Sequence, residues 1–167
     1  SWQFTYIVIP LLIIIAKIMD VSLGTMRIIL IAKGAKKFAP YLGFLEVLIW
    51  IATIGQVMKN LTNPITYIAY ALGFAIGNYV GILIENKLAL GTVLIRVITR
   101  FDSSALIDHL RKKDFGVTTV PAEGSAGPVS IIFTVIKRSK IQDVVRIIKE
   151  LNPNAFYSIE DVRYVSG

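Results

Sequence analysis

Charged side chains interrupt the first apolar segment of the chain, residues 4–32, which contains Lys17, Asp20 and Arg27. Asp20 and Arg27 are seven residues apart and therefore share one face of a helix, with Lys17 about one turn before Asp20. A charge near the middle of a bilayer costs about 2.5–3.5 kcal/mol on insertion scales, so such residues face the interior of a bundle and pair there. The next apolar segment carries a single charge, Glu46, and we expect it to pair with Arg27. These residue types predict a polar track for an ion or a proton.

A purely structural interpretation competes with this one. Arg27 can extend its side chain to the headgroups beside Lys33, and Asp20 can cap a break between a short outer helix and an interfacial helix. The sequence favours the structural interpretation for Arg27 and leaves both open for Asp20. In either case we expect Asn78 and Gln56 to form hydrogen bonds between helices as structural contacts.

The second half of the chain contains residue types suited to binding an anion. Glycines let a backbone turn and approach an anion closely with its N–H groups, and a helix that opens at Ser139 would add its N-terminus. Each feature alone is usually a turn or a solvated charge, but together they favour a phosphate-bearing ligand. Thr118, Gly124 and Arg138 are the first candidates. The full predicted set is Thr118, Thr119, Glu123, Gly124, Gly127, Lys137, Arg138 and Arg163.

Catalysis has little support in the sequence. The chain has no cysteine and a single histidine, His109, so it offers no thiolate nucleophile and no cysteine-based zinc site. Glu160 and Asp161 are adjacent in a predicted strand and therefore point to opposite faces, which is poor geometry for a carboxylate pair. We expect no enzyme activity, no cofactor and no metal.

The composition places the chain in a membrane. Hydrophobic residues make up 54% and the mean hydropathy is +0.66, but long apolar runs end near Leu90. The remainder has the charge density of a soluble α/β module, so we expect a transmembrane domain over 1–90 and a soluble domain over 91–167. The predicted spans are about 4–32, 41–58 and 62–84.

The third predicted span carries a glycine at every fourth position: Gly73, Gly77 and Gly81. A helix of this length, at ~1.5 Å per residue, crosses the ~30 Å hydrocarbon core. Small residues at this spacing let another helix approach closely in lipid, where dispersion drives packing. The ladder therefore predicts a tight helix–helix contact.

The basic turn Lys33–Lys37 predicts the orientation, because positive loops stay in the cytoplasm. Three spans then place the N-terminus outside the plasma membrane and the soluble domain in the cytoplasm. The first span has no basic start, so we expect it to be retained rather than cleaved as a signal peptide; the leading Ser1 suggests a trimmed or replaced start. The net charge of +7 indicates contact with anionic lipids. The sequence shows no basic surface with interspersed aromatic residues, so it does not favour nucleic-acid binding.

The soluble half has the element order β-α-β-β-α-β, the ferredoxin-like arrangement. We expect strands at 92–99, 116–120, 129–136 and 155–165, a turn at 123–128, and helices that Ser103 or Ser104 and Ser139 cap. Helices on one face of the sheet leave the other face free, and a core of this size favours association with copies of the chain. The predicted core residues are Leu106, Leu110, Ile141, Val144, Val145, Ile148, Phe156, Ile159 and Val162.

Four motifs carry a family resemblance: the run from Asp20 to Arg27 (DVSLGTMR), the run from Glu85 to Gly91 (ENKLALG), Gly116-Val-Thr118, and Ala155-Phe-Tyr-Ser158 after Asn152-Pro153. Over essentially its whole length the chain resembles the bacterial membrane proteins of uncharacterised protein family 0316. Its second half resembles the C-terminal domain of YitT-type membrane proteins. The resemblance implies three membrane helices and a cytoplasmic ferredoxin-like domain, and it implies no activity.

A looser likeness, at the level of the fold alone, is to PII-type signalling proteins and ACT domains, which bind small effectors. PII proteins are trimers that hold nucleotides between subunits, although this chain lacks room for their long partner-binding loop. Two functions follow. The first is a ligand-responsive homotrimer whose soluble domain binds a nucleotide-like effector and regulates the helices through residues 85–91. The alternative is an oligomeric transporter or channel along Asp20, Arg27 and Glu46, gated by the soluble domain.

Overall fold

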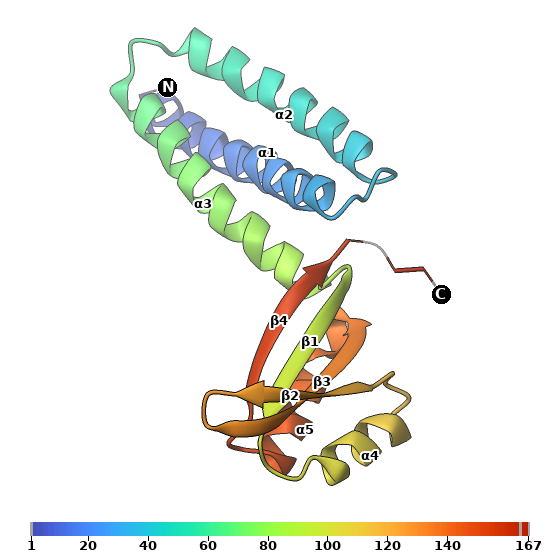
Figure 1. The fold of residues 1–167 in the computed structure, drawn as a ribbon. Helices are drawn as coiled ribbons and strands as arrows, with labels where there is room; N and C mark the ends of the chain where they lie inside the picture. The colour runs from blue at the N-terminus through green and yellow to red at the C-terminus, as the bar shows by residue number, and fades with distance from the viewer. Residues whose placement is uncertain (1, 164, 167) are drawn as a thin grey trace. The chain divides into compact units, whose positions relative to one another are not determined.

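The computed structural model describes residues 2–163, 165 and 166. The chain divides into two compact units, Ser1–Leu88 and Ala89–Gly167. The first unit is all helix, and the second combines a sheet with helices (Figure 1).

The helical unit contains three apolar helices. A π-helical turn, η1 (Phe4–Val8), leads into α1 (Ile9–Ala32), which is followed by α2 (Ala39–Lys59) and α3 (Pro64–Leu88). The three apolar segments have 29, 21 and 25 residues and are long and apolar enough to cross a membrane. α1 lies between the other two helices (Figure 1) and contacts both. The predicted architecture of three spans is confirmed, and these helices identify the chain as a membrane protein.

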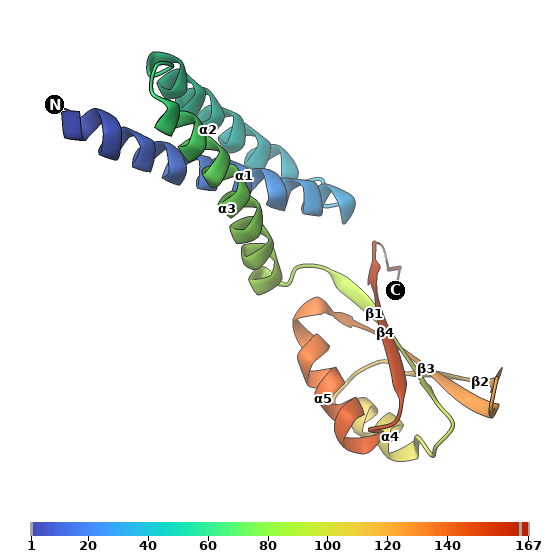
Figure 2. The ribbon, with the colours of Figure 1, turned by 90° about the vertical axis from the view of Figure 1, so that its left-hand side faces the viewer.

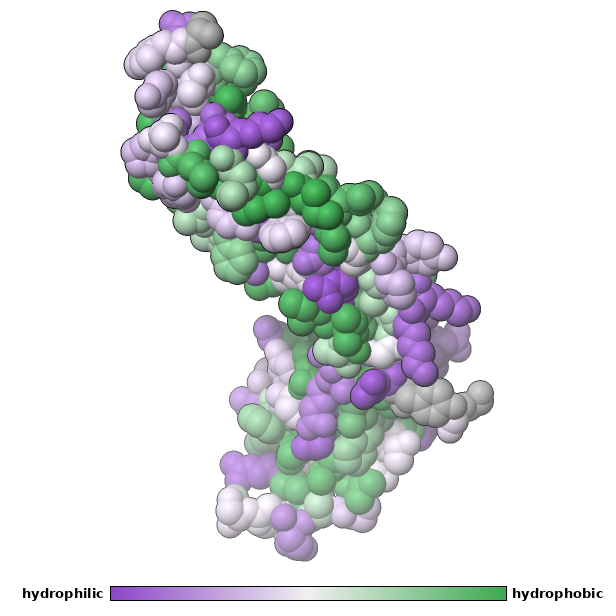
Figure 3. Space-filling model, turned by 90° about the horizontal axis from the view of Figure 1, so that it is seen from above, coloured by the Kyte–Doolittle hydropathy of each residue, from purple (hydrophilic) through white to green (hydrophobic). Residues whose placement is uncertain are grey.

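The surface of the molecule carries many exposed apolar side chains, as expected for helices solvated by lipid. Figure 3 shows hydrophobic residues over much of one face, interrupted by hydrophilic patches. On α2, for example, Phe44, Leu48 and Ile51 are exposed. Exposing so many apolar side chains would be unfavourable in water, whereas it is favourable in hydrocarbon.

The glycine ladder of α3 packs against α1 within the same chain. A Cβ atom built on Gly73, Gly77 or Gly81 would lie 2.6 to 2.8 Å from a Cβ atom of α1, closer than real side chains approach. The contact also includes a hydrogen bond, since the Ser22 hydroxyl donates to the Gly77 carbonyl at 3.2 Å. The predicted close helix contact therefore exists, and its partner is α1 rather than another copy.

The second unit is a four-stranded antiparallel sheet with strand order β2-β3-β1-β4. Both α4 and α5 lie on the same side of this sheet (Figure 2). This is the predicted ferredoxin-like fold. Residue 164, within the predicted last strand, lies outside the described residues. The elements are β1 (Thr92–Thr99), α4 (Ser104–Lys112), β2 (Thr118–Gly124), β3 (Gly127–Lys137), a 3-10 turn η2 (Arg138–Lys140), α5 (Ile141–Leu151) and β4 (Phe156–Val162).

The core of this unit lies between the sheet and the two helices. Alternate residues of β1 and β3 face the helices because successive side chains of a strand point to opposite faces. Of the predicted core residues, Leu106, Leu110, Val144 and Ile148 are buried, and Ile141 packs at the margin; Val145 is half-buried. The remaining members are Val93, Ile95, Val97, Ile132, Ile136 and Ile147.

The predicted core of β4 was wrong. Phe156 is 66% exposed and Ile159 is 39% exposed, Val162 is half-buried, and Tyr157 packs against the core instead. Phe156 pairs with Ile98, which places both on the face away from the helices. The strand has apolar residues on both faces, so the alternation in the sequence did not indicate which face is buried.

Two local predictions also need correction. The turn predicted over 123–128 contains only Ser125 and Ala126, because β2 and β3 pair as far as Gly124 and Gly127. Ser139 lies inside η2 and α5 begins after Lys140, so Ser139 is not the helix cap.

At the start of α4, Ser103 occupies the N-cap position without a side-chain hydrogen bond. The side-chain hydrogen bonds at this helix start come from Asp102 instead. Its Oδ1 accepts a hydrogen bond from the backbone N–H of Ser104 at 3.1 Å and another from the Ser104 hydroxyl at 2.7 Å. These hydrogen bonds hold the pKa of the Asp102 carboxyl below its ordinary value. Aspartate suits the capping of a helix N-terminus because its carboxylate oxygens accept hydrogen bonds and do not donate them.

The glycine contact gives a direct stability prediction. We expect Gly77→Ala to lower the stability of the protein in detergent by about 1–3 kcal/mol, because the added methyl group overpacks the contact with α1. The matched control is Gly55→Ala in α2, since nothing lies within 4 Å of a Cβ there; it gains helix propensity without a clash. Thermal unfolding followed by circular dichroism compares the two variants. Equal melting temperatures would contradict the packing described here.

Candidate functional site: a charged groove on the first helix

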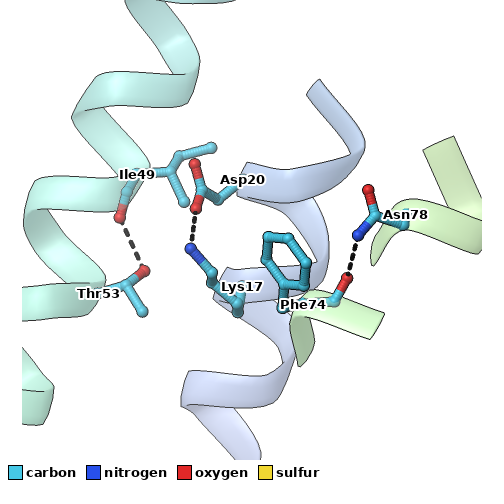
Figure 4. A network of polar contacts seen from close by, with 6 residues as sticks. All are labelled: Lys17, Asp20, Ile49, Thr53, Phe74 and Asn78. Atoms are coloured by element: carbon cyan, nitrogen blue, oxygen red, sulfur yellow. Dashed lines mark hydrogen bonds and ion pairs between the residues drawn. The ribbon is translucent and has the colours of Figure 1, made fainter. Parts of the chain in front are cut away.

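Lys17 and Asp20 form a buried ion pair on α1. Lys17 Nζ lies 2.8 Å from Asp20 Oδ2, and the two residues are 4% and 3% exposed. The ammonium group also lies over the Tyr70 ring, 4.4 Å from its centroid, and 5.9 Å from that of Phe74. Figure 4 shows the two side chains pointing toward one another, with Phe74 close to Lys17. Opposite charge and π faces thus replace the water that this ammonium has lost.

The pair lies near the middle of its helical segment. The midpoint of Phe4–Ala32 is residue 18, so Lys17 and Asp20 sit at the depth where an unpaired charge is most costly. α1 is continuous through Asp20. The interpretation in which Asp20 caps a helix break is therefore wrong, and its partner is Lys17.

A second ion pair joins α1 to α2 two turns further along. Arg27 Nε lies 2.6 Å from Glu46 Oε2, with side chains 31% and 23% exposed, so the pairing that the polar-track interpretation named is present, although the sequence favoured extension of Arg27 to the headgroups. Glycines on both helices make room for it. A Cβ on Gly24 would lie 2.6 Å from Glu46 Oε1, and one on Gly43 would lie 3.2 Å from Arg27 Cδ.

Three of these charged residues, Lys17, Asp20 and Glu46, line a groove of about 360 Å³ on α1. Its floor is α1, one wall is α2, and α3 contributes Asn78. A second groove of about 660 Å³ shares Glu46 and Val47 and continues past Arg27 to Lys36, in the turn between α1 and α2. Polar groups therefore line a route from the middle of α1 to its C-terminal end. The first groove is lined by Lys17, Asp20, Val21, Gly24, Thr25, Ile28, Glu46, Val47, Trp50 and Asn78.

Hydrogen bonds fix the α3 side of this groove. The Thr25 hydroxyl donates to Asn78 Oδ1 at 3.1 Å, and Asn78 Nδ2 donates to the Phe74 carbonyl at 3.1 Å, also drawn in Figure 4. The interhelical role expected for Asn78 is thus present. Gln56, expected to act likewise, contributes its backbone carbonyl to Asn60 at the end of α2.

The residues predicted to bind an anion do not converge within one chain. Glu123, Gly124 and Gly127 are at the turn between β2 and β3, whereas Lys137 pairs with Thr92 at the opposite end of β3. Ten residues of strand separate Gly127 from Lys137, about 33 Å.

The other members of that set follow the same division. Arg138 donates its backbone N–H to Gly91 at 3.0 Å, and Arg163 follows Val162, which also pairs with Thr92. These basic residues share the Lys137 end of the sheet. Thr118 and Thr119 pair with residues in the middle of β3. Across the described residues, no group of three or more His, Asp or Glu side chains is placed to hold a metal.

Sequence reasoning missed part of the groove. Trp50 was not singled out, although it lies four residues after Glu46 and so shares its helix face. Lys17 was noted without the partner that it has, although a lysine three residues before an aspartate in an apolar segment signals a local ion pair. Gly24 shares this helix face with Asp20 and Arg27, but only the structure shows that Glu46 lies against it.

The fold and the groove define the class of protein: a three-helix membrane protein with a charged groove and a ferredoxin-like C-terminal domain. Residues 25–82 match DUF5698, a domain of unknown function, and residues 115–167 match DUF2179, described as an uncharacterized protein conserved in bacteria. The second match bears out the resemblance of the C-terminal half to YitT-type proteins.

Relatives establish the family. The UPF0316 protein of Syntrophotalea carbinolica is 55% identical over 94% of this chain and 80% of its own length. That of Acetivibrio thermocellus is 54% identical over 99% and 81%, and that of Methanospirillum hungatei 51% over 98% and 82%. The chain belongs to the UPF0316 family.

Two solved structures match the C-terminal part. A functionally unknown protein from Pediococcus pentosaceus is 14% identical, with a TM-score of 0.43, over 46% of this chain and 95% of that one. A DUF2179 protein from Eubacterium ventriosum is 22% identical, with a TM-score of 0.36, over 41% and 97%.

The buried ion pair gives a stability prediction in the form of a double-mutant cycle. We expect Asp20→Asn to destabilise the protein by about 3–5 kcal/mol, because it leaves the Lys17 ammonium buried without its counter-charge. Lys17→Met has a comparable cost for the converse reason. The double variant Lys17→Met/Asp20→Asn removes both charges, so its loss should be well below the sum. Melting temperatures in one detergent measure all three, and additive losses would rule out the pair as a coupled unit.

Proposed function

We propose that this protein moves a small polar or charged solute across a membrane, along the groove on α1. The observation that carries the proposal is the Lys17–Asp20 pair, which is buried at the midpoint of an apolar segment and continuous with a charged groove. Intramembrane charges are costly and mark ion or substrate paths. A helix that needed only to span the bilayer or to pack on α3 would retain none of them.

The groove is one side of a path, and copies of the chain complete it. α2 contacts α1 but has few contacts with α3, so the groove on α1 is open on its far side. Hydrocarbon on that side would leave Glu46 and Asp20 poorly solvated. Another copy placed over the groove would enclose the charged residues and leave a water-filled route between chains.

The C-terminal unit supports the same oligomer. The sheet face away from α4 and α5 is largely apolar, with Val135 45% and Phe156 66% exposed. Near its centre Arg96 Nη2 pairs with Glu160 Oε1 at 3.0 Å. An exposed apolar sheet face of this kind marks an interaction surface, and we propose a homo-oligomer, with a trimer favoured, in which these domains gate the path.

The basic turn between α1 and α2 favours one orientation. Lys33, Lys36 and Lys37 together place this turn and the C-terminal unit in the cytoplasm, by the excess of positive charge in cytoplasmic loops. The N-terminus is then outside the plasma membrane, and the basic residues contact anionic lipid headgroups. The proposal requires no chemical reaction and no cofactor.

The transport proposal predicts a solute flux that depends on the groove. Purified protein in sealed proteoliposomes should pass small ions or amines faster than empty liposomes, measured by a pH-sensitive dye inside the vesicles and by uptake of labelled solutes. We expect Glu46→Gln to reduce that flux at least tenfold by removing the groove's charge. Glu150→Gln, at an exposed position of α5, is the matched control and should leave it unchanged. Vesicles that pass none of the tested solutes would count against the proposal.

A second candidate function concerns the C-terminal unit. The predicted anion-binding residues form two groups at opposite ends of β3. A ring of copies can bring Gly124 and Gly127 of one chain close to Lys137, Arg138 and Arg163 of the next. We propose that a nucleotide-like effector binds between copies in this way and biases the helices through residues 85–91. α3 continues as a helix to Leu88, so this connection is partly rigid.

The effector proposal predicts ligand-dependent stability. At concentrations well above its dissociation constant, a bound nucleotide should raise the melting temperature of the full-length oligomer, because it binds only the folded state. We expect one member of a panel of adenine and guanine nucleotides to do so, and Arg138→Ala to abolish the shift. The result against it is an unchanged melting temperature with every nucleotide at millimolar concentration.

A further inference from the structure

The groove on α1 presents hydrogen-bond acceptors to an incoming solute. Both of its cationic neighbours are already engaged: Lys17 Nζ with Asp20 Oδ2, and Arg27 Nε with Glu46 Oε2. Each carboxylate has a second oxygen; Glu46 Oε1 lies close against Gly24, and the Glu46 side chain is 23% exposed. A carboxylate accepts several hydrogen bonds at once, so these oxygens retain capacity for another donor.

The remaining polar groups have the same preference. Thr25 gives its hydroxyl proton to Asn78 Oδ1, and Asn78 Nδ2 donates to the Phe74 carbonyl, so the Thr25 oxygen retains lone pairs. The charged residues that line this groove are two carboxylates and one ammonium, Asp20, Glu46 and Lys17, so an anion would meet more negative than positive charge. A cation would meet acceptors on the α1, α2 and α3 sides.

An aromatic ring completes the wall. Trp50 lies one turn after Glu46 on α2, lines the same groove and is 44% exposed. The indole face attracts cations more strongly than any other side-chain ring. The other lining residues include Val21, Ile28 and Val47, which suit a hydrocarbon skeleton rather than a hydrated metal ion.

The environment of Lys17 indicates which kind of cation can be held at this level of the helices. The Lys17 ammonium is an alkylammonium group held by a carboxylate and by the faces of Tyr70 and Phe74. Glu46, Asp20 and Trp50 offer the adjoining groove the same combination of carboxylate and aromatic ring. Lys17 therefore shows how the groove can bind the ammonium group of a free solute.

Resting on the proposed transport function, we propose that the solute of this groove is a small organic monocation, an alkylammonium or a guanidinium compound. Its charge lies against the Glu46 carboxylate, in the groove that the buried Asp20 also lines, and its apolar part lies against Trp50. Anionic solutes of the same size are repelled by the two carboxylates.

The test is a binding experiment that does not depend on transport. The chain has two tryptophans, Trp2 and Trp50, so the Trp2→Phe variant of the full chain in detergent reports on Trp50 alone. We expect n-butylammonium chloride to change its fluorescence saturably. Sodium butyrate, which has a four-carbon chain and the opposite charge, should have no effect at equal ionic strength.

Variants connect the response to the groove. Glu46→Gln should weaken butylammonium binding about tenfold or more, because a charge-assisted contact is lost. Arg27→Gln/Glu46→Gln removes both charges of the pair and should bind equally weakly while keeping the fold, which separates lost charge from misfolding. Glu150→Gln, at an exposed position of α5, should bind as the parent does.

The outcomes distinguish the inference from the function on which it rests. Saturable binding of butyrate instead of butylammonium, binding that both Glu46 variants leave intact, or no saturable response to either ion would overturn the cation assignment. Flux of another solute in proteoliposomes would then still support transport. Butylammonium binding without any flux would support the assignment and contradict transport.

Discussion

The arrangement of the helical unit depends on an ion pair buried among apolar helices. Lys17 and Asp20 lie at the midpoint of the first segment, where an isolated charge would be too costly to retain. Their mutual contact at 2.8 Å, with two aromatic rings of α3 around the ammonium, gives both groups partners in place of water. α3 therefore has to approach α1 closely at this level, and Gly73 lies directly against Lys17.

The same constraint explains the asymmetry of the bundle. α3 packs on α1 along the glycine ladder, whereas α2 makes its charged contact further along, where Arg27 meets Glu46. The groove lies on α1 where these two contacts leave it uncovered. Small residues bring one helix close and open space beside the other, so packing and the polar groove have one origin.

Much of this could be predicted from the sequence. The spans and the β-α-β-β-α-β order follow from apolar run length and periodicity. The pairing of Arg27 with Glu46 was one of two interpretations that the sequence allowed, and the less favoured one. The face of β4 could not be predicted, because Phe156 and Tyr157 are both aromatic and only tertiary packing buries one of them. Gly124 and Arg138 do not converge within one chain because the length of β3 keeps them apart, and strand length in an edge hairpin depends on pairing rather than on composition. Trp50 could not be assigned to the groove from the sequence, because that assignment depends on how α2 packs on α1.

The most direct test concerns whether the groove is open to water within the membrane. The chain contains no cysteine, so a single introduced thiol reports its own surroundings, and only a hydrated thiolate reacts quickly. Val47 lines the groove, while its neighbour Leu48 is exposed outside it. In proteoliposomes we expect Val47→Cys to react rapidly with a charged, membrane-impermeant methanethiosulfonate and Leu48→Cys to stay unreactive. Equal reactivity of the two positions, or none at Val47→Cys, would contradict a polar path along α1.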